Sequence, residues 1–218
     1  MKLNFVLSAG LLLSSLGALP AGATVLYSQS AANSSAWTSE SSNGSNGFNQ
    51  VWDNFTLVST ATVTDVAWTG WILPDFGIIN GFTIGFYADS VDGPNHSPGA
   101  LIYSAAISGD ANETRVGVHN AYGIFNFNAP VVFPATLGTQ YWISIVADPQ
   151  SATWNWANSH GGDSSFFEDD QNGTVGPVGT DVAFTLSNVT APEPSSFALA
   201  GTGILALGGM VRRRFARK

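Results

Sequence analysis

The chain has 218 residues, with 15 acidic and 7 basic side chains, a net charge of −8 at pH 7 and no cysteine. The absence of cysteine excludes a disulfide framework, thiolate chemistry and a cysteine-based metal site, so packing must stabilise the fold. Aromatic residues make up 12% of the chain and accompany abundant Gly, Asn, Thr and Ser, a composition that favours strands over helices.

The first 23 residues have the pattern of a secretory signal peptide. Lys2 is followed by an apolar run from Phe5 to Leu19, and Pro20 then precedes Ala21-Gly22-Ala23, an A-x-A cleavage site. The run is interrupted by Ser and Gly and stops at the proline, which favours cleavage over retention as a membrane helix. We therefore expect export and a mature chain that begins at Thr24.

Residues 24–190 are long enough for one domain with its own core and too short for two comfortable ones. Fourteen of the acidic residues fall in this stretch, whereas Arg115 is its single base, so its net charge is −13. A field of this sign repels nucleic acid and anionic lipid surfaces, so we exclude nucleic acid as a partner.

Short alternating segments predict strands throughout residues 24–190. The polar tract from Ser34 to Asn49 contains two Asn-Gly pairs and is expected to form a long loop or hairpin tip. We find no sustained helical period, so the expected fold is all-β, an antiparallel β-sandwich of jelly-roll-like form. The segments expected to be strands are Thr24–Ser28, those around Phe55, Val66 and Ile84, Leu101–Ala105, Tyr122–Phe127, Val131–Ala135, Tyr141–Ala147, Trp154–Ala157 and Val182–Leu186. Turns are expected at Asp92-Gly93-Pro94, Ser97-Pro98-Gly99, Asp148-Pro149 and Gly176-Pro177.

Two tryptophan pairs are candidates for a carbohydrate platform. Trp154 and Trp156 lie two apart, so on a strand both rings point to one face, where they suit stacking against sugar rings. Trp68 and Trp71 lie three apart, on opposite faces unless Gly70 forms a bulge. The rival interpretation places these large rings in the core of the sandwich.

The acidic loops offer two groups of oxygen ligands. Because the chain has carboxylates and no cysteine, calcium is the metal that such groups would select, and we expect no other cofactor. Neither group matches an EF-hand loop, so both are also interpreted as solvated turns. The groups are Asp89 with Asp92, and Asp163 with Glu168, Asp169 and Asp170.

Catalytic motifs are weak in this sequence. His96, His119 and His160 show no metal-ligand spacing, and no G-x-S-x-G motif is present. The acidic cluster from Asp163 to Asp170 leaves a polysaccharide-active hydrolase as the alternative, although adjacent carboxylates seldom converge across a sugar. We expect a non-catalytic protein.

The last 28 residues, Ala191–Lys218, combine three elements in order. Pro192-Glu193-Pro194 precedes an apolar run from Phe197 to Val211, which as a helix would span roughly 22 Å of a hydrocarbon core of about 30 Å. A basic end at 212–218 then halts transfer, with its charges on the cytoplasmic side of the membrane. The charged residues of this end are Arg212, Arg213, Arg214, Arg217 and Lys218.

This order resembles the PEP-CTERM sorting signal of bacteria that make exopolysaccharide. The resemblance implies that exosortase, a membrane protease, recognises Pro192-Glu193-Pro194, removes the helix and basic end, and passes the protein from the inner membrane to the cell surface or extracellular matrix. Residues 82–89, 97–99 and 138–145 are similar to β-sandwich domains of other such proteins, which carry no settled activity. An ordinary single-pass anchor and a GPI signal are the alternatives, although a GPI tail would end apolar.

The resemblance leaves the molecular partner of the exported domain open. We expect a secreted surface or matrix protein, associated with exopolysaccharide or binding carbohydrate.

Overall fold

A computed structural model describes residues 22–41, 48–169 and 173–189 of the chain. Most of the predicted signal peptide and all of the C-terminal tail, 191–218, lie outside these residues. The strands belong to one unit, Ala23–Val189. Nowhere in the described ranges is there a helix long and apolar enough to cross a membrane.

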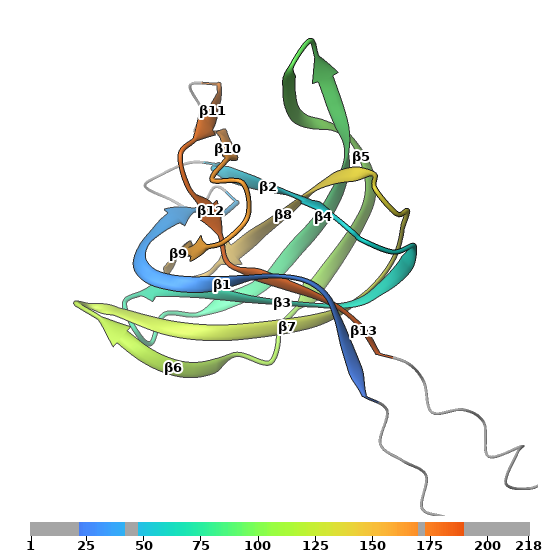
Figure 1. The fold of residues 1–218 in the computed structure, drawn as a ribbon. Coiled ribbons are helices and arrows are strands. Elements are labelled where there is room, and N and C mark those ends of the chain that lie inside the picture. Colours follow the sequence, from blue (N-terminus) through green and yellow to red (C-terminus); the bar gives the residue numbers. More distant parts are fainter. Residues whose placement is uncertain (1–21, 42–47, 170–172, 190–218) are drawn as a thin grey trace, which may run out of the picture. The chain divides into compact units, whose positions relative to one another are not determined.

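The described strands form two antiparallel sheets (Figure 1). Sheet A has seven strands in the order β12-β9-β1-β13-β3-β7-β6, and sheet B has six in the order β11-β10-β2-β8-β4-β5. The strand bounds are β1 (Ala23–Thr38), β2 (Gln50–Thr56), β3 (Ala61–Leu73), β4 (Ile79–Asp92), β5 (Asn95–Ser108), β6 (Thr114–His119), β7 (Tyr122–Ala135), β8 (Gln140–Pro149), β9 (Thr153–His160), β10 (Phe166–Asp169), β11 (Thr174–Val178), β12 (Asp181–Val182) and β13 (Phe184–Val189).

Strands β9 and β13 share one position in sheet A, between β1 and β3. The first half of β1 pairs with β13 and the second half with β9, and β3 pairs with β13 through Asp65–Trp68 and with β9 through Gly70–Leu73. The end of β9 also pairs with β12, which leads through Ala183 into β13. Two short segments from distant parts of the chain therefore complete one row of the sheet.

The core lies between the sheets and is rich in aromatic rings. Phe86 of β4 stacks on Phe133 of β7 with ring centroids 4.2 Å apart, and Phe82 meets Trp68 at 5.1 Å. Phe55 of β2 meets Phe184 of β13 at 6.4 Å. These contacts join sheet B to sheet A, and they confirm the predicted antiparallel β-sandwich.

Several strands are longer than the sequence predicted. β1 continues to Thr38, so the first part of the expected loop at 34–49 is strand, which pairs with β9 beyond a bulge between Ala31 and Ala36. The turn expected at Ser97-Pro98-Gly99 lies inside β5, and Gly176-Pro177 lies inside β11. Strands β5 and β11 are the two edge strands of sheet B, where a proline removes no hydrogen bond to a second neighbouring strand.

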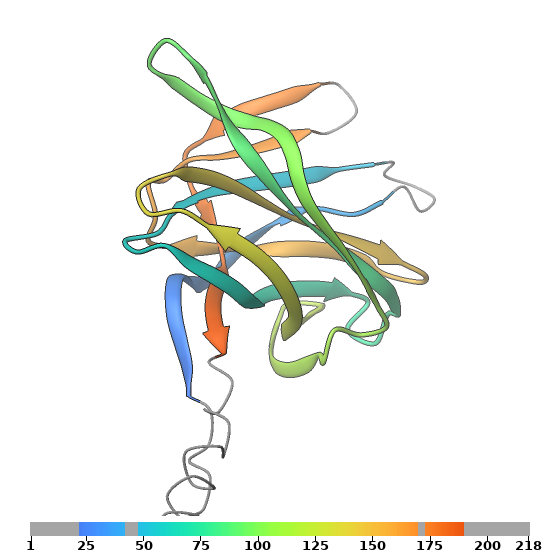
Figure 2. The same cartoon turned by 90° about the vertical axis from the view of Figure 1, so that its right-hand side faces the viewer.

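The turn at Asp92-Gly93-Pro94 is confirmed, because it joins β4 to β5 with Gly93 at φ 62°. Figures 1 and 2 both show this β4–β5 hairpin, in green, extending beyond the sandwich beside the β10–β11 hairpin.

Candidate functional site

The first tryptophan pair lies in the core. Trp154 and Trp156 share one face of β9, as their spacing predicts, but it is the inner face of sheet A, and both side chains are 0% exposed. Phe82 of the opposite sheet lies 5.4 Å from Trp154, and Phe184 lies 6.1 Å from Trp156. The prediction of an exposed carbohydrate platform at Trp154 and Trp156 is therefore wrong, because both rings fill the interior of the sandwich.

The second pair is buried as well. Trp68 is 3% exposed in the core, where it stacks on Phe127 at 5.5 Å. Trp71 points to the other face of β3, as the spacing of three predicts, and the pairing stays in register at Gly70 without a bulge. On that face His119 covers the indole of Trp71 in a stacked contact of 4.7 Å, which leaves it 6% exposed. The platform prediction is also wrong here.

The outer face of sheet B carries aromatic residues that the sequence analysis did not select. Core residues alternate along β2, β8 and β4, so the residues between them point away from the core. In this way Trp52, Trp142 and Tyr87 reach the outer face, together with Phe167 of β10. We call these four rings the outer aromatic face.

The strand register places these residues in two neighbouring rows. One row runs across four strands through Phe167, Trp52, Ser144 and Gly85. The next row contains Asn54, Trp142 and Tyr87. Rings from four different strands therefore lie on one continuous surface.

Neighbouring side chains fix the orientation of Tyr87. A β-carbon at Gly85 would lie 2.8 Å from the Tyr87 ring, so the glycine makes room for the ring to lie over the sheet. Gln50 Nε2 donates hydrogen bonds to the Tyr87 hydroxyl at 2.8 Å and to Ser144 Oγ at 3.0 Å. The Trp52 ring meets Tyr87 edge-on at 6.1 Å. Trp52, Tyr87 and Phe167 remain half-buried, with part of each side chain open to solvent.

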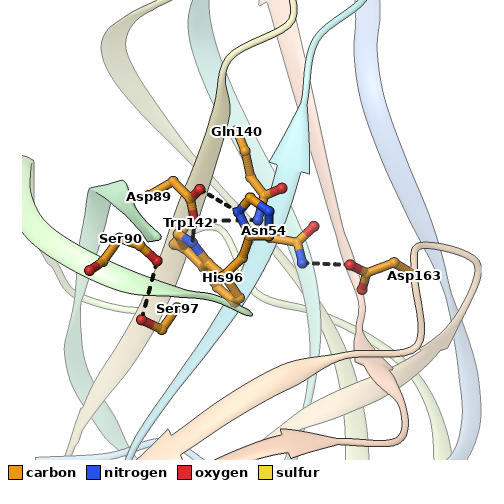
Figure 3. Close-up of polar contacts among 8 residues, drawn as sticks. All are labelled: Asn54, Asp89, Ser90, His96, Ser97, Gln140, Trp142 and Asp163. Atoms are coloured by element: carbon orange, nitrogen blue, oxygen red, sulfur yellow. Dashed lines mark hydrogen bonds and ion pairs between the residues drawn. The ribbon is translucent and has the colours of Figure 1, made fainter. Parts of the chain in front are cut away.

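Trp142 is held under a polar cluster formed near the turn of the β4–β5 hairpin (Figure 3). Its indole Nε1 donates to Asp89 Oδ1 at 2.8 Å, and Asp89 Oδ2 lies 2.5 Å from His96 Nδ1. Gln140 donates to the same carboxylate at 3.5 Å, and the Trp142 ring meets Phe167 edge-on at 5.2 Å. Trp142 is therefore 1% exposed, although it lies on the outer side of the sheet.

The same surface is tied to the loop after β9. Asn54 Nδ2 donates to Asp163 Oδ2 at 2.9 Å, and Figure 3 shows the two side chains pointing toward each other beside the Trp142 cluster. One predicted member of each acidic group thus lies at the border of this face.

The acidic groups do not converge in the described residues. Asp92 lies at the exposed tip of the β4–β5 hairpin, whereas Asp89 lies three residues earlier on β4 and accepts hydrogen bonds from Trp142 and Gln140. Asp170 lies outside the described residues, and the parts of the chain that are described contain no group of three or more His, Cys, Asp or Glu side chains suited to a metal ion. The predicted calcium sites thus gain no geometric support.

Glu168 and Asp169 are successive residues of β10, so their side chains point to opposite faces of the strand. Two carboxylates in this arrangement do not flank one glycosidic bond. The geometry of this pair does not favour the hydrolase alternative.

Buried carboxylates form a second polar feature that the sequence did not reveal. Asp53 of β2 is 0% exposed and accepts a hydrogen bond at 2.8 Å from the backbone N–H of Val182, so it links sheet B to sheet A. Burial raises the pKa of Asp53 well above its ordinary value, and it also raises the pKa values of Asp181 and Glu40. Glu40 accepts from the backbone N–H of Trp154 at 2.8 Å. The buried carboxylates thus connect structural elements, and Asp181 lies next to Asp163 at the border of the outer aromatic face.

The comparisons with known proteins identify the C-terminal signal. The described domain is all-β, and residues 190–214 match the family model described as the PEP-CTERM protein-sorting motif. The chain therefore carries this sorting signal, which marks an exported protein for processing by exosortase, a membrane protein. The match includes Pro192-Glu193-Pro194 and Arg212–Arg214, which lie outside the described residues. No curated protein and no solved structure matched the chain.

Proposed function

We propose that the exported domain is a non-catalytic, polysaccharide-binding protein of the cell surface or extracellular matrix, and that the outer aromatic face is its binding surface. One observation carries the proposal: Trp52, Tyr87 and Phe167 are half-buried on the outside of sheet B, where they contribute nothing to the core between the sheets.

The chemistry of this face suits sugars. A sugar ring presents apolar C–H groups on its faces and hydroxyls at its edge, so it binds to aromatic rings that have amide groups beside them. The amide of Asn54 lies in the same row of the sheet as Trp142 and Tyr87, and the amide of Gln50 donates to the Tyr87 hydroxyl. Because a hydrogen bond from Gln50 holds Tyr87 in place, this ring loses little side-chain entropy when a ligand stacks on it.

The sorting signal gives the proposal its cellular setting. A protein that exosortase releases beyond the inner membrane meets the exopolysaccharide outside the cell. Binding on this face requires neither a metal ion nor a catalytic group.

The test is retention of the secreted protein on exopolysaccharide from its own cells, measured by affinity electrophoresis. Trp52→Ala and Phe167→Ala are expected to weaken retention by tenfold or more, as truncation of a central aromatic contact does. Phe76→Ala is the matched control, because this phenylalanine is 86% exposed in the loop after β3. Equal retention of all three variants and the unaltered protein would contradict the proposal, and release of reducing ends would favour the hydrolase alternative.

A further inference from the structure

Carboxylates border the outer aromatic face at several points. Asp89 lies near the hairpin end of β4, and Asp163 lies beside Asn54. Asp148 is exposed near the C-terminal end of β8, four residues after Ser144. Asp169 lies on β10, two residues after Phe167. Strand alternation points both of these side chains to the outer side.

Lysine and arginine are absent from the described part of this face. The single Lys or Arg of residues 24–190 is Arg115, which belongs to β6 at the edge of sheet A. Its guanidinium donates through Nε to Asp75 Oδ1 at 2.9 Å and through Nη2 to Asp75 Oδ2 at 2.5 Å. His96, the histidine at the border of the face, already contacts Asp89.

We infer that the outer aromatic face selects uncharged polysaccharide and excludes polyuronates and other anionic glycans. The inference rests on the proposed function and adds the class of ligand. A glycan carboxylate on this face would lie among protein carboxylates with no cation to pair with, and the repulsion extends over about 10 Å in 0.1 M salt. The groups in the middle of the face are rings, amides and a hydroxyl, which match the hydroxyls and C–H surfaces of neutral sugars.

A polycation is a poorer match than a neutral chain. Asp89 and Asp163 border the face, and both accept hydrogen bonds from the protein itself, from Trp142 and Asn54. A glycan ammonium would have to compete with these donors.

The experiment compares four soluble polymers as affinity matrices for the processed protein purified from its own cells. Two are neutral, a β-glucan and a galactomannan, one is anionic, polygalacturonate, and one is cationic, chitosan. Retention on each polymer is measured at 0.1 M and 0.5 M salt for the unaltered protein, Trp52→Ala and the control Phe76→Ala. We expect the unaltered protein and Phe76→Ala to be retained on a neutral polymer at both salt concentrations, and Trp52→Ala to be retained about tenfold more weakly. No retention is expected on polygalacturonate at 0.1 M salt.

The outcomes separate this inference from the proposed function. Retention on polygalacturonate or chitosan that depends on Trp52 and exceeds retention on both neutral polymers would overturn the inference and leave polysaccharide binding intact. Failure of every polymer and of the native exopolysaccharide to retain the protein would overturn both. Retention on polygalacturonate that appears only at 0.5 M salt would support the charge argument, because salt screens the repulsion.

Discussion

We expect Trp154→Ala to lower the free energy of unfolding by about 3 to 5 kcal/mol. The side chain is fully buried between the sheets, with the Phe82 ring at 5.4 Å and the Trp156 ring at 6.4 Å. In a domain of 150–250 residues each kcal/mol lowers Tm by roughly 2–4 °C, so the expected drop is roughly 6–20 °C.

Gly70 provides a second test of the same packing. A β-carbon at this position would lie 2.4 Å from Trp154 Nε1, closer than any contact allows, so Gly70→Ala is expected to cost about 1–3 kcal/mol. The smaller ring of Trp154→Phe should relieve this overlap. Trp154→Phe also removes a buried N–H that meets no hydrogen-bond partner among the described residues. The double variant is therefore expected to lose less stability than the sum of the two single variants, by about 0.5 kcal/mol or more.

The assay is equilibrium denaturation of the purified protein, followed by circular dichroism and tryptophan fluorescence. Phe76→Ala is the control, because a change at an exposed side chain should stay within about 0.5 kcal/mol. A cost below about 1 kcal/mol for Trp154→Ala, or strict additivity of the Gly70 and Trp154 changes, would refute the packing argument.

Three further predictions concern pH, sorting and the outer face. Burial raises the folded-state pKa values of Asp53 and Asp181, so the folded protein binds protons at these carboxylates more tightly than the unfolded chain does. The denaturation midpoint should therefore rise as the pH falls from 7 towards the ordinary aspartate pKa near 3.9. A midpoint that falls over this interval would contradict the raised pKa values. Replacing Pro192-Glu193-Pro194 with alanines should permit export but leave the protein in the inner-membrane fraction, and surface display at the unaltered level would indicate a plain anchor. Gly85→Ala should displace the Tyr87 ring and weaken glycan retention with little change in Tm, and unchanged retention would show that the ring position does not matter.

The sequence predicted the class of fold because strand alternation is a local property. Phe82, Ile84 and Phe86 lie on one face in the structure, as their spacing requires. The shared row of β9 and β13 could not be predicted in the same way. It depends on pairing between residues more than a hundred positions apart, such as Gln29 with Phe184, which no local pattern encodes.

The location of the candidate site was missed for a related reason. Alternation shows that Trp154 and Trp156 share a face, but it does not say which face is the interior. That choice depends on the residues between the aromatic ones: Asn155 separates the core tryptophans, whereas Ile143 and Ile145 take the inner positions of β8 and leave Trp142 outside. Along β2, β4 and β8, one set of alternate positions holds the core residues and the other set holds Trp52, Tyr87 and Trp142. Aromatic residues in the second set would have identified the outer face.

The predicted processing sites lie next to β1 and β13 in the sequence, and the outer aromatic face is built on other strands. Ala23 at the start of β1 pairs with Val189 at the end of β13, so both ends of the domain leave from neighbouring strands of sheet A. The predicted cleavage after Ala23 would remove a single residue from β1, and the Pro192-Glu193-Pro194 motif begins three positions beyond β13. Neither event touches sheet B. Because the chain continues from β13 of sheet A and the rings lie on sheet B, we expect the protein to bind glycan equally well before and after exosortase acts.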